Sequence, residues 1–332
     1  MSWFSPHKRI YLDYAAATPV LPEVQREMEK FYSKEFYNPN AIYEEGVKVK
    51  KAVDEYRTRI AKIIGVAKEA IIFTSGGTES NVLAICGVKS GKVVVESDSH
   101  PSVIEAIRKS DSEEVVLVSS PVVSNKLGRK IREERRKNNS EYPLLHIDAS
   151  QGAAYFNVGF EPLACDLLTL DSAKIYGPKG IGALVVRKGV KLDLQPRGTP
   201  AVPLIAGFAK ALEIAARDKE AEYKRLTSLS AKFSEIIQDS LPQAEITRIL
   251  PNIVNISVPG ILPELLVLAL DRRGVMVSAG PACNTNKPEP PETPVRFSLG
   301  RATSEKELKE AATIFCHAVK NLLKSVRQAQ DK

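Results

Sequence analysis

The sequence predicts an α/β fold with two parts. The first is a large domain with a mostly parallel, seven-stranded-type sheet covered by helices on both faces, and the second is a smaller α+β domain. Short apolar runs rich in β-branched residues alternate with helical segments, as in consecutive βαβ units. The chain has 332 residues, more than one hydrophobic core usually supports. Two domains are therefore expected.

Strands of the large domain are expected where short apolar runs end in polar or small residues. These runs are AIIFTS (70–75), KVVVES (92–97), EEVVLVSS (113–120), PLLHIDAS (143–150), DLLTLDS (166–172) and IGALVVR (181–187). Helices are expected at TESNVLAICGV (78–88) and HPSVIEAIRKS (100–110), where they would supply crossovers between parallel strands.

A long helix from about Pro203 to Asp239, broken or kinked near its middle, is expected to bridge the two domains. Beyond it, strands and helices alternate in an α+β pattern. The strands are EITRI (245–249), NIVNISV (252–258) and VRFSLG (295–300), and the helices cover 264–274 and 304–326. We assign residues 14–219 to the large domain, and residues 1–13 and 220–332 to the small domain.

The composition is that of an ordinary soluble protein, with 43% hydrophobic and 26% charged residues. No run approaches 18 consecutive apolar residues, and the first residues contain no apolar stretch of signal-peptide length. A cytoplasmic protein without membrane attachment is expected. The four cysteines lack CxxC spacing, which argues against a disulfide framework or a zinc site, and no metal is expected.

The formal net charge is +7, and the densest basic run is RKIREERRK (129–137). Acidic residues interrupt this run, which is typical of a solvated helix. No recognised nucleic-acid-binding motif accompanies the basic residues, so direct nucleic-acid binding is not expected.

The segment FTSGGTESN (73–81) places a Ser-Gly-Gly-Thr turn between a strand and a helix. Glycines let the backbone approach a phosphate closely, and the N–H groups and dipole of a helix start favour an anion. A plain strand-to-helix turn with a threonine cap is the alternative interpretation.

Two further strand ends carry an acid and a lysine. Asp148, in HIDASQ (146–151), ends a strand at the edge where ligands bind in open α/β sheets. Lys174, in DLLTLDSAKIYGPKG (166–180), follows the next strand. A carboxylate can pair with a protonated pyridine nitrogen, and a lysine can form a Schiff base with a cofactor and later move protons. The alternative for Asp148 alone is a solvated strand-end acid or a helix cap. The alternative for Lys174 alone is an ordinary surface charge.

Taken together, these motifs and others along the chain resemble the cysteine desulfurases, the class V branch of fold-type-I pyridoxal-phosphate enzymes. The matching segments are IYLDYAAATP (10–19), NPN (38–40), TSGGTESN (74–81), SHPSV (99–103), SNKLG (124–128), HIDASQ (146–151), SAKIYGPKGIGAL (172–184), RGT (197–199), SAGPAC (278–283) and VRFSLGR (295–301).

The resemblance implies that the chain binds pyridoxal 5′-phosphate. Lys174 would be the Schiff-base lysine, and Asp148 would contact the ring nitrogen. Gln151 would face the phenolic oxygen, and His100 would stack on the ring.

The resemblance also assigns residues to the phosphate and to the substrate. Gly77 and Thr78 would hold the phosphate, and Asn125 would lie near the cofactor and the substrate carboxylate. Arg296 would bind that carboxylate, for which the planar guanidinium is suited. Thr199 resembles a residue that relatives donate to the neighbouring subunit's phosphate, so a homodimer is expected.

Cys283 separates a desulfurase from an ordinary aminotransferase. The resemblance implies that its thiolate attacks the sulfur of L-cysteine, leaving alanine and a persulfide on the protein. A free cysteine is usually a small buried hydrophobe. That interpretation suits Cys86 and Cys316 on apolar helix faces, whereas Cys283 lies among Gly, Pro, Asn and Thr.

The chain departs from the family pattern just before the lysine. Most relatives carry a Ser-x-His pair of phosphate donors there, and this chain has Asp171, Ser172 and Ala173. The side chain of Ala173 cannot donate a hydrogen bond to phosphate, and Asp171 would repel a dianion unless it points away or is protonated. Ser172 is the remaining candidate donor to the phosphate. Tyr43 and Lys126 also replace a common histidine and a common acid.

The loop around Cys283 is short, and four prolines between Pro288 and Pro294 stiffen it. A stiff loop favours local sulfur transfer to a particular acceptor or iron–sulfur scaffold protein, or to a small thiol.

Three functions follow in order of preference. The first is a cysteine desulfurase that supplies sulfur for iron–sulfur clusters, thio-cofactors or tRNA. The second is another class V enzyme, such as a selenocysteine lyase, an amino-acid lyase or an aminotransferase. The third is a cofactor-poor scaffold relative.

Overall fold

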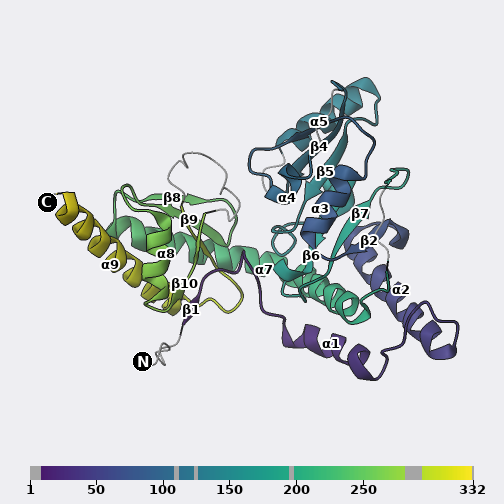
Figure 1. The fold of residues 1–332 in the computed structure, drawn as a ribbon, viewed down its shortest axis with the longest axis horizontal. Helices are drawn as coiled ribbons and strands as arrows, with labels where there is room; N and C mark the ends of the chain where they lie inside the picture. The colour runs from purple at the N-terminus through teal and green to yellow at the C-terminus, as the bar shows by residue number, and fades with distance from the viewer. Residues whose placement is uncertain (1–8, 108–111, 123–125, 194–197, 281–293, 331–332) are drawn as a thin grey trace. The chain divides into compact units, whose positions relative to one another are not determined.

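The computed structural model describes residues 9–107, 112–122, 126–193, 198–280 and 294–330. The chain divides into two compact units, Thr18–Lys219 and Met1–Ala17 with Glu220–Lys332. Each unit has its own sheet and its own helices (Figure 1).

The unit 18–219 is built on a sheet that has six strands in the described part of the chain, compared with the seven expected. In spatial order they are β2 (Ile71–Thr74), β7 (Gly182–Val186), β6 (Leu167–Asp171), β5 (Leu144–Asp148), β4 (Val115–Pro121) and β3 (Lys92–Val95). Strands β3 to β6 pair in parallel, and β7 is antiparallel to both of its neighbours. The segment between β6 and β7 is too short for a crossover helix, so the chain turns back as a hairpin.

Helices surround this sheet. They are α1 (Pro22–Ser33), α2 (Glu44–Ile64), α3 (Gly77–Cys86), α4 (Pro101–Ile104), α5 (Lys126–Asn138) and α6 (Phe160–Leu163), with 3₁₀ turns η1 (Lys68–Ala70) and η2 (Ser172–Lys174). The helix expected over 100–110 is much shorter than predicted. Ala106 and Ile107 pack on the core from a turn that follows α4.

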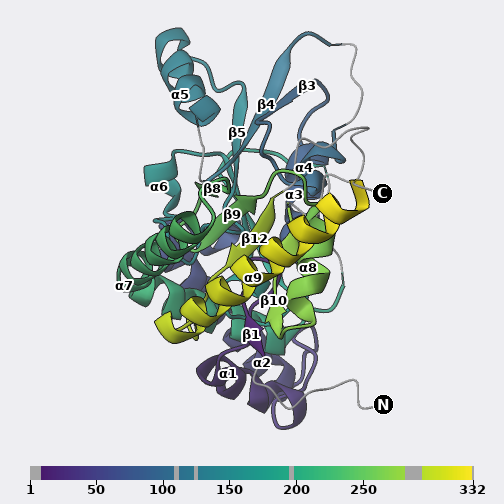
Figure 2. The same cartoon turned by 90° about the vertical axis from the view of Figure 1, so that its left-hand side faces the viewer.

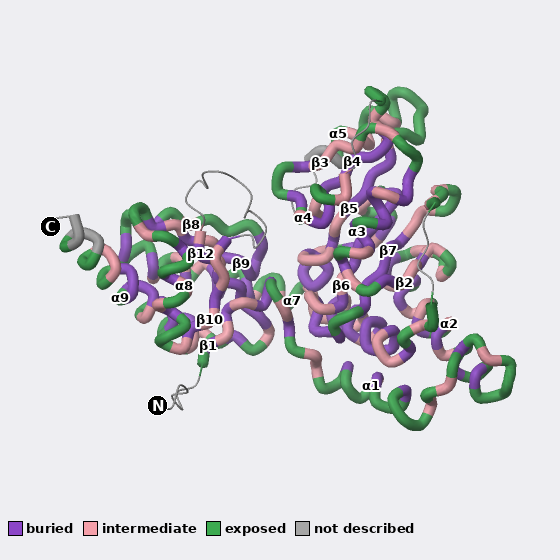
Figure 3. The backbone as a smooth tube through the Cα atoms, in the orientation of Figure 1, coloured by how far each residue is buried: buried purple, intermediate pink, exposed green. Residues whose placement is uncertain are grey.

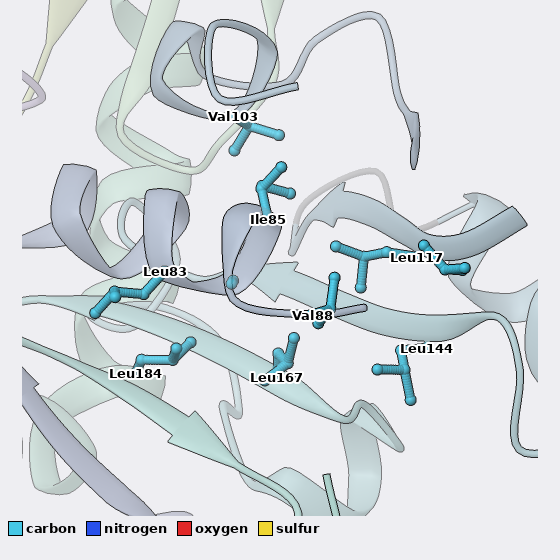
Figure 4. Close-up of a cluster of buried hydrophobic side chains, with 10 residues drawn as sticks. Leu83, Ile85, Val88, Val103, Leu117, Leu144, Leu167 and Leu184 are labelled. Carbon is cyan, nitrogen blue, oxygen red and sulfur yellow. The ribbon is translucent and has the colours of Figure 1, made fainter. Parts of the chain in front are cut away.

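The core next to α3 is a cluster of buried aliphatic side chains (Figure 4). Leu83 and Ile85 of α3 pack there with Leu117, Leu144 and Leu167 of the strands. Strands β4, β5 and β6 are buried along most of their length (Figure 3), as expected for a sheet that is covered on both faces. Burying this surface holds α3 in place against the sheet.

The other unit contains a four-stranded antiparallel sheet and a two-stranded parallel pair. The sheet order is β11 (Ser278–Ala279), β12 (Val295–Ser298), β9 (Ile253–Ser257) and β8 (Glu245–Arg248), and the pair is β1 (Ile10–Tyr11) with β10 (Val275–Met276). Helices α8 (Pro263–Asp271) and α9 (Glu305–Gln330) pack against each other, and α8 also packs on the sheet (Figure 2). Phe297 lies between Phe233 and Phe315, with ring centroids 5.0 and 5.4 Å away.

Helix α7 (Val202–Ser240) runs for 39 residues and contributes to both units. The predicted break near its middle is wrong. Proline occurs only in its first turn, and its middle is rich in alanine and long unbranched side chains that favour a helix. No helix in the described ranges is long and apolar enough to cross a membrane.

Candidate active site

Three of the predicted motifs meet at one edge of the six-stranded sheet. Strands β2, β5 and β6 run in the same direction, so Thr74, Asp148 and Asp171 end at the same edge. Gly182, the first residue of β7, pairs with both Thr74 and Asp171. The glycine turn, the acid and the lysine segment are therefore neighbours, as expected for a ligand site at the carboxyl ends of strands.

The turn after β2 exposes the start of α3. Gly76 has φ 153° and ψ −174°, a conformation open essentially to glycine alone. The hydroxyls of Thr74 and Ser80 lie 2.7 Å apart, and the carboxylate of Glu79 accepts a 2.5 Å hydrogen bond from Ser75 N. These bonds tie the turn to the helix, whose N-terminal dipole favours an anion. Thr78, the second helical residue, is exposed.

Gly77, the first residue of α3, is enclosed by two side chains. An ideal Cβ atom at this position would lie 2.8 Å from Oγ of Ser150 and 3.2 Å from Oδ2 of Asp171. Only glycine fits without displacing one of them. Oγ of Ser150 is buried and has no hydrogen-bond partner among the described residues. The predicted phosphate turn is thus lined by a hydroxyl and a carboxylate.

The side chain of Asp171 is held in place by a hydrogen bond from a nearby backbone N–H group. Its Oδ1 accepts a 2.9 Å hydrogen bond from the backbone N–H of Ala173 and caps η2. A carboxylate held here opposes a second anion through like-charge repulsion. Ser172 is fully buried, and a Cβ on Gly177 would lie 2.1 Å from its Oγ. That hydroxyl faces Gly177, and its contact with phosphate stays a prediction.

Asp148 receives a hydrogen bond on each carboxylate oxygen. Oδ1 accepts from the backbone N–H of Ser150 at 2.9 Å, and Oδ2 accepts from Nδ2 of Asn81 at 2.8 Å. The two donors come from different segments, the turn after β5 and helix α3. They fix the orientation of the acid at the end of its strand.

His146 lies two residues before Asp148 and is fully buried. Its ring nitrogens lie 2.8 Å from the hydroxyl of Ser119 and 3.0 Å from that of Thr169. Burial lowers the pKa of His146 to about 4, against an opposing effect of Asp148. This histidine is therefore neutral at physiological pH, and its hydrogen bonds with Ser119 and Thr169 lie within the buried core.

The remaining predicted residues of the unit 18–219 occupy strand ends and loops. Lys174 ends η2 and is half-buried, and Gln151 is half-buried in the turn after β5. His100 is the exposed N-cap of α4. Thr199 is exposed and lines a pocket of about 190 Å³ together with residues 36–39.

Two predicted residues, Asn125 and Cys283, lie outside the described residues. Cys86, Cys165 and Cys316 are free. Cys316 is buried, as expected, and Cys86 is half-buried with its Sγ 3.3 Å from the carbonyl oxygen of Ala106.

Arg296 belongs to β12 in the other unit. Its Nη2 lies 3.0 Å from Oδ1 of Asp13, whose Oδ2 accepts a 2.8 Å hydrogen bond from the Ser278 hydroxyl. Nε of Arg296 is buried, and no hydrogen-bond partner for it lies in the described segments. The ion pair fixes one edge of the guanidinium and leaves other N–H donors for a ligand.

Four residues that support these groups were not predicted from the sequence: Asn81, Ser150, Asp13 and Ser102, whose Oγ lies 2.7 Å from Nδ1 of His100. A signal exists for Asn81, because it is the one side-chain amide in α3 and lies one turn after Gly77. Nothing local in the sequence marks Ser150 or Ser102, whose importance depends on contacts with other elements.

The profile of the class V aminotransferase family matches residues 10–116, 103–197 and 193–310 of the chain. A cysteine desulfurase IscS from Dictyoglomus turgidum is 31% identical over an alignment of 376 positions, which covers 95% of each chain. A mitosomal cysteine desulfurase from Encephalitozoon cuniculi is 30% identical, covering 95% of this chain and 88% of that protein. The chain belongs to the cysteine desulfurase branch of the class V aminotransferase family.

Solved structures share the fold of this chain. A NifS-like protein superposes with a TM-score of 0.84 at 25% identity, covering 94% of this chain and 99% of that one. The structure of SspA in complex with cysteine has a TM-score of 0.68 at 25% identity, covering 87% of this chain and 98% of that one. These matches confirm the predicted α/β transferase fold.

Class V aminotransferases use pyridoxal 5′-phosphate, which confirms the predicted cofactor. The residues present fit this group at its ring end, where Asp148 is oriented by two donors and Lys174 follows the adjacent strand. At the phosphate end the glycine turn and the start of α3 fit an anion, although Asp171 opposes it. The described residues therefore fit the cofactor at its ring end, and at its phosphate end they include one unfavourable neighbour, Asp171.

Proposed function

We propose that the chain is an L-cysteine desulfurase, which converts L-cysteine to L-alanine and captures the sulfur as a persulfide on Cys283. The observation that carries this proposal is the arrangement of Asp148 and the Lys174 segment at one sheet edge, in a chain similar to cysteine desulfurases along nearly its whole length.

When bound, pyridoxal 5′-phosphate supplies an electron sink for the carbon atoms of the amino acid. Asp148 would hold the ring nitrogen protonated, and Gln151 would donate to the phenolic oxygen. His100 would cover the ring face. Lys174 would hold the cofactor between turnovers and move the proton at the substrate Cα during turnover.

Cys283 would carry out the sulfur chemistry. Its thiolate attacks the sulfur atom of the substrate, an S–S bond forms, and the substrate C–S bond breaks with its electron pair left on carbon. That carbon takes a proton and becomes the methyl group of alanine. Cysteine and a protein thiol thus give alanine and a protein persulfide, with no external oxidant or reductant.

Arg296 and Asn125 would recognise the substrate carboxylate. Arg296 has one edge of its guanidinium held by Asp13, which limits its rotation. A pre-oriented guanidinium loses less entropy on binding a carboxylate than a free one. SspA, a structural relative, was solved with cysteine, which supports a cysteine-sized amino acid as the substrate.

The cofactor-loaded protein tests this proposal directly. Incubation with L-cysteine should yield alanine and protein persulfide in equal amounts, and Cys283→Ala should abolish both. Cys316→Ala, at a buried cysteine outside the proposed chemistry, is the matched control and should retain turnover. Unchanged products from Cys283→Ala would contradict the role of Cys283 and favour another class V reaction. A missing absorbance band near 400–430 nm, the approximate range of a lysine-bound cofactor, would favour a scaffold role.

We also propose that the active unit is a homodimer. Exposed apolar side chains gather in the segment 32–47, including Phe36 (63% exposed), Ile42 (97%) and Tyr43 (50%). Thr199 lines the same pocket as Phe36, so a partner bound to this surface would also meet Thr199. Apolar groups so exposed are more favourable in an interface.

The persulfide would pass to an acceptor or iron–sulfur scaffold protein, or to a small thiol. The free state of Cys86, Cys165 and Cys316 suits a reducing compartment, which supports a cytoplasmic location. Incubation with ³⁵S-labelled cysteine and separated cell fractions would identify the acceptor by the labelled protein that appears.

A further inference from the structure

Four side chains form a hydrogen-bonded series from the sheet edge to α4. Oδ2 of Asp148 accepts from Nδ2 of Asn81 at 2.8 Å, and the same nitrogen lies 3.0 Å from Oγ of Ser102. Oγ of Ser102 lies 2.7 Å from Nδ1 of His100. Asn81 is 2% exposed and Ser102 is 7% exposed, so water competes little for these bonds. The series joins the two groups proposed to contact the cofactor ring at its nitrogen and at its face.

The direction of donation along this series follows from the chemistry of each group. The amide nitrogen of Asn81 only donates, so the carboxylate of Asp148 and the hydroxyl of Ser102 both accept from it. Rotating the amide by 180° would place its oxygen against the carboxylate, which is unfavourable. The hydroxyl hydrogen of Ser102 is then left to point toward His100.

Nδ1 of His100 is therefore an acceptor. The backbone N–H of Ser102 donates to it at 3.1 Å, in addition to the nearby hydroxyl. A neutral imidazole that accepts at Nδ1 carries its hydrogen on Nε2. His100 thus presents an N–H donor at the outer end of its ring.

Packing alone does not account for an asparagine at position 81. Its Oδ1 is buried and has no hydrogen-bond partner within the described part of the chain. A buried acceptor without a partner is unfavourable, and an apolar residue would avoid that cost. The amide is explained by its two donors, which reach Asp148 and Ser102.

We propose that Asn81 and Ser102 are positioning residues that order Asp148 and His100 together, and that they hold His100 as the Nε2–H tautomer. Any proton that His100 exchanges with a ligand then moves at Nε2. The contacts of Asp148 and His100 with the cofactor rest on the proposed function. The coupling between the two side chains rests on the hydrogen bonds alone.

The tautomer is tested by ¹⁵N NMR of the cofactor-loaded protein labelled at its four histidines, each assigned by a His→Gln variant. We expect the His100 ring to show the Nε2–H pattern. Ser102→Ala and Asn81→Ala should both shift the Nδ1 resonance of His100 in the same direction, because each weakens the donor at Nδ1. A protonated Nδ1 in the unaltered protein, or an Nδ1 resonance unmoved by Asn81→Ala, would overturn the proposal.

The effect on Asp148 is tested with ¹⁵N-labelled pyridoxal 5′-phosphate, whose ring-nitrogen resonance reports its protonation. Asn81→Ala should move this resonance toward the unprotonated value and lower kcat for alanine about tenfold or more, with KM changed less than about threefold. Asn252→Ala is the matched control, since Asn252 is also 2% exposed, donates to the carbonyl of Leu299 and has an unpartnered Oδ1 among the described residues.

Asn252→Ala should lower thermal stability without changing the cofactor resonance. If Asn81→Ala fails to fold, the milder Ser102→Ala carries the test. An unchanged ring-nitrogen resonance in Asn81→Ala would contradict the positioning role. Both NMR measurements are independent of the reaction catalysed, so a failure of the desulfurase assay leaves them interpretable.

Discussion

Oδ2 of Asp171 would lie 3.2 Å from a Cβ atom on Gly77, so this carboxylate lies against the first residue of α3. The start of a helix attracts anions, and here an anionic side chain already occupies part of that field. In the proposed site at Gly77 and Thr78, the phosphate of the cofactor would bind beside a like charge. Asp171 would then lower the affinity of this chain for the cofactor.

Replacing Asp171 with asparagine should raise the affinity for pyridoxal 5′-phosphate by about tenfold, or about 1.4 kcal/mol, because one like-charge contact is removed. Affinity for pyridoxal, which lacks the phosphate, should change little. Equilibrium titration of cofactor absorbance measures both constants. Asp193→Asn, at an exposed acid of the same unit, is the control. Equal gains for both ligands would show that Asp171 does not act at the phosphate.

The stability of the protein should fall as pH is lowered from about 6.5 to about 4, the interval between the unfolded and folded pKa values of His146. The folded pKa lies below the unfolded one, so the unfolded chain binds the proton first. The contribution present above this interval is on the order of 3 kcal/mol and is lost as pH falls through it.

Denaturant unfolding at a series of pH values measures this contribution. His146→Gln should flatten the dependence in this interval, and His317→Gln, at an exposed histidine of α9, should leave it unchanged. A steep dependence that survives His146→Gln would assign it to other groups.

Arg296→Lys should raise KM for L-cysteine by about tenfold or more, because a planar donor pair that suits a carboxylate is lost. Asp13→Asn should raise KM by less, since Arg296 remains but loses the partner that holds it. Steady-state alanine formation separates KM from kcat. Arg272→Lys, at an exposed arginine of the same unit, should change neither. A loss confined to kcat would argue against carboxylate recognition.

The double substitution Phe36→Ser and Ile42→Ser should convert a dimer to a monomer, because it removes exposed apolar area from the proposed interface. Light scattering after size-exclusion chromatography gives the mass. Ile249→Ser, at an isoleucine 58% exposed in the other unit, is the control. A monomeric unaltered protein, or a dimer that persists in the double variant, would refute this interface.

Much of the fold could be predicted from local patterns. The runs that end at Thr74, Asp148 and Asp171 are strands, because β-branched apolar residues bounded by polar ones fit a buried sheet. The predicted break in α7 is wrong because no residue near the middle of this segment disrupts a helix. Helix α4 ends before Ala106 and Ile107, which pack against the core. Such contacts with distant segments cannot be predicted from a local sequence pattern.

The sequence by itself determined the fold class, the family and the identity of the groups that can do the chemistry, because residue type and spacing are properties of the chain. It also identified Asp171 as an unusual residue before the lysine. The tertiary structure decided that this carboxylate lies against Gly77, that Ser150 encloses the same glycine, and that Asn81 joins Asp148 to Ser102. Each of these contacts joins separate strands, helices or turns, and only packing of the sheet and its helices brings such atoms within hydrogen-bonding distance.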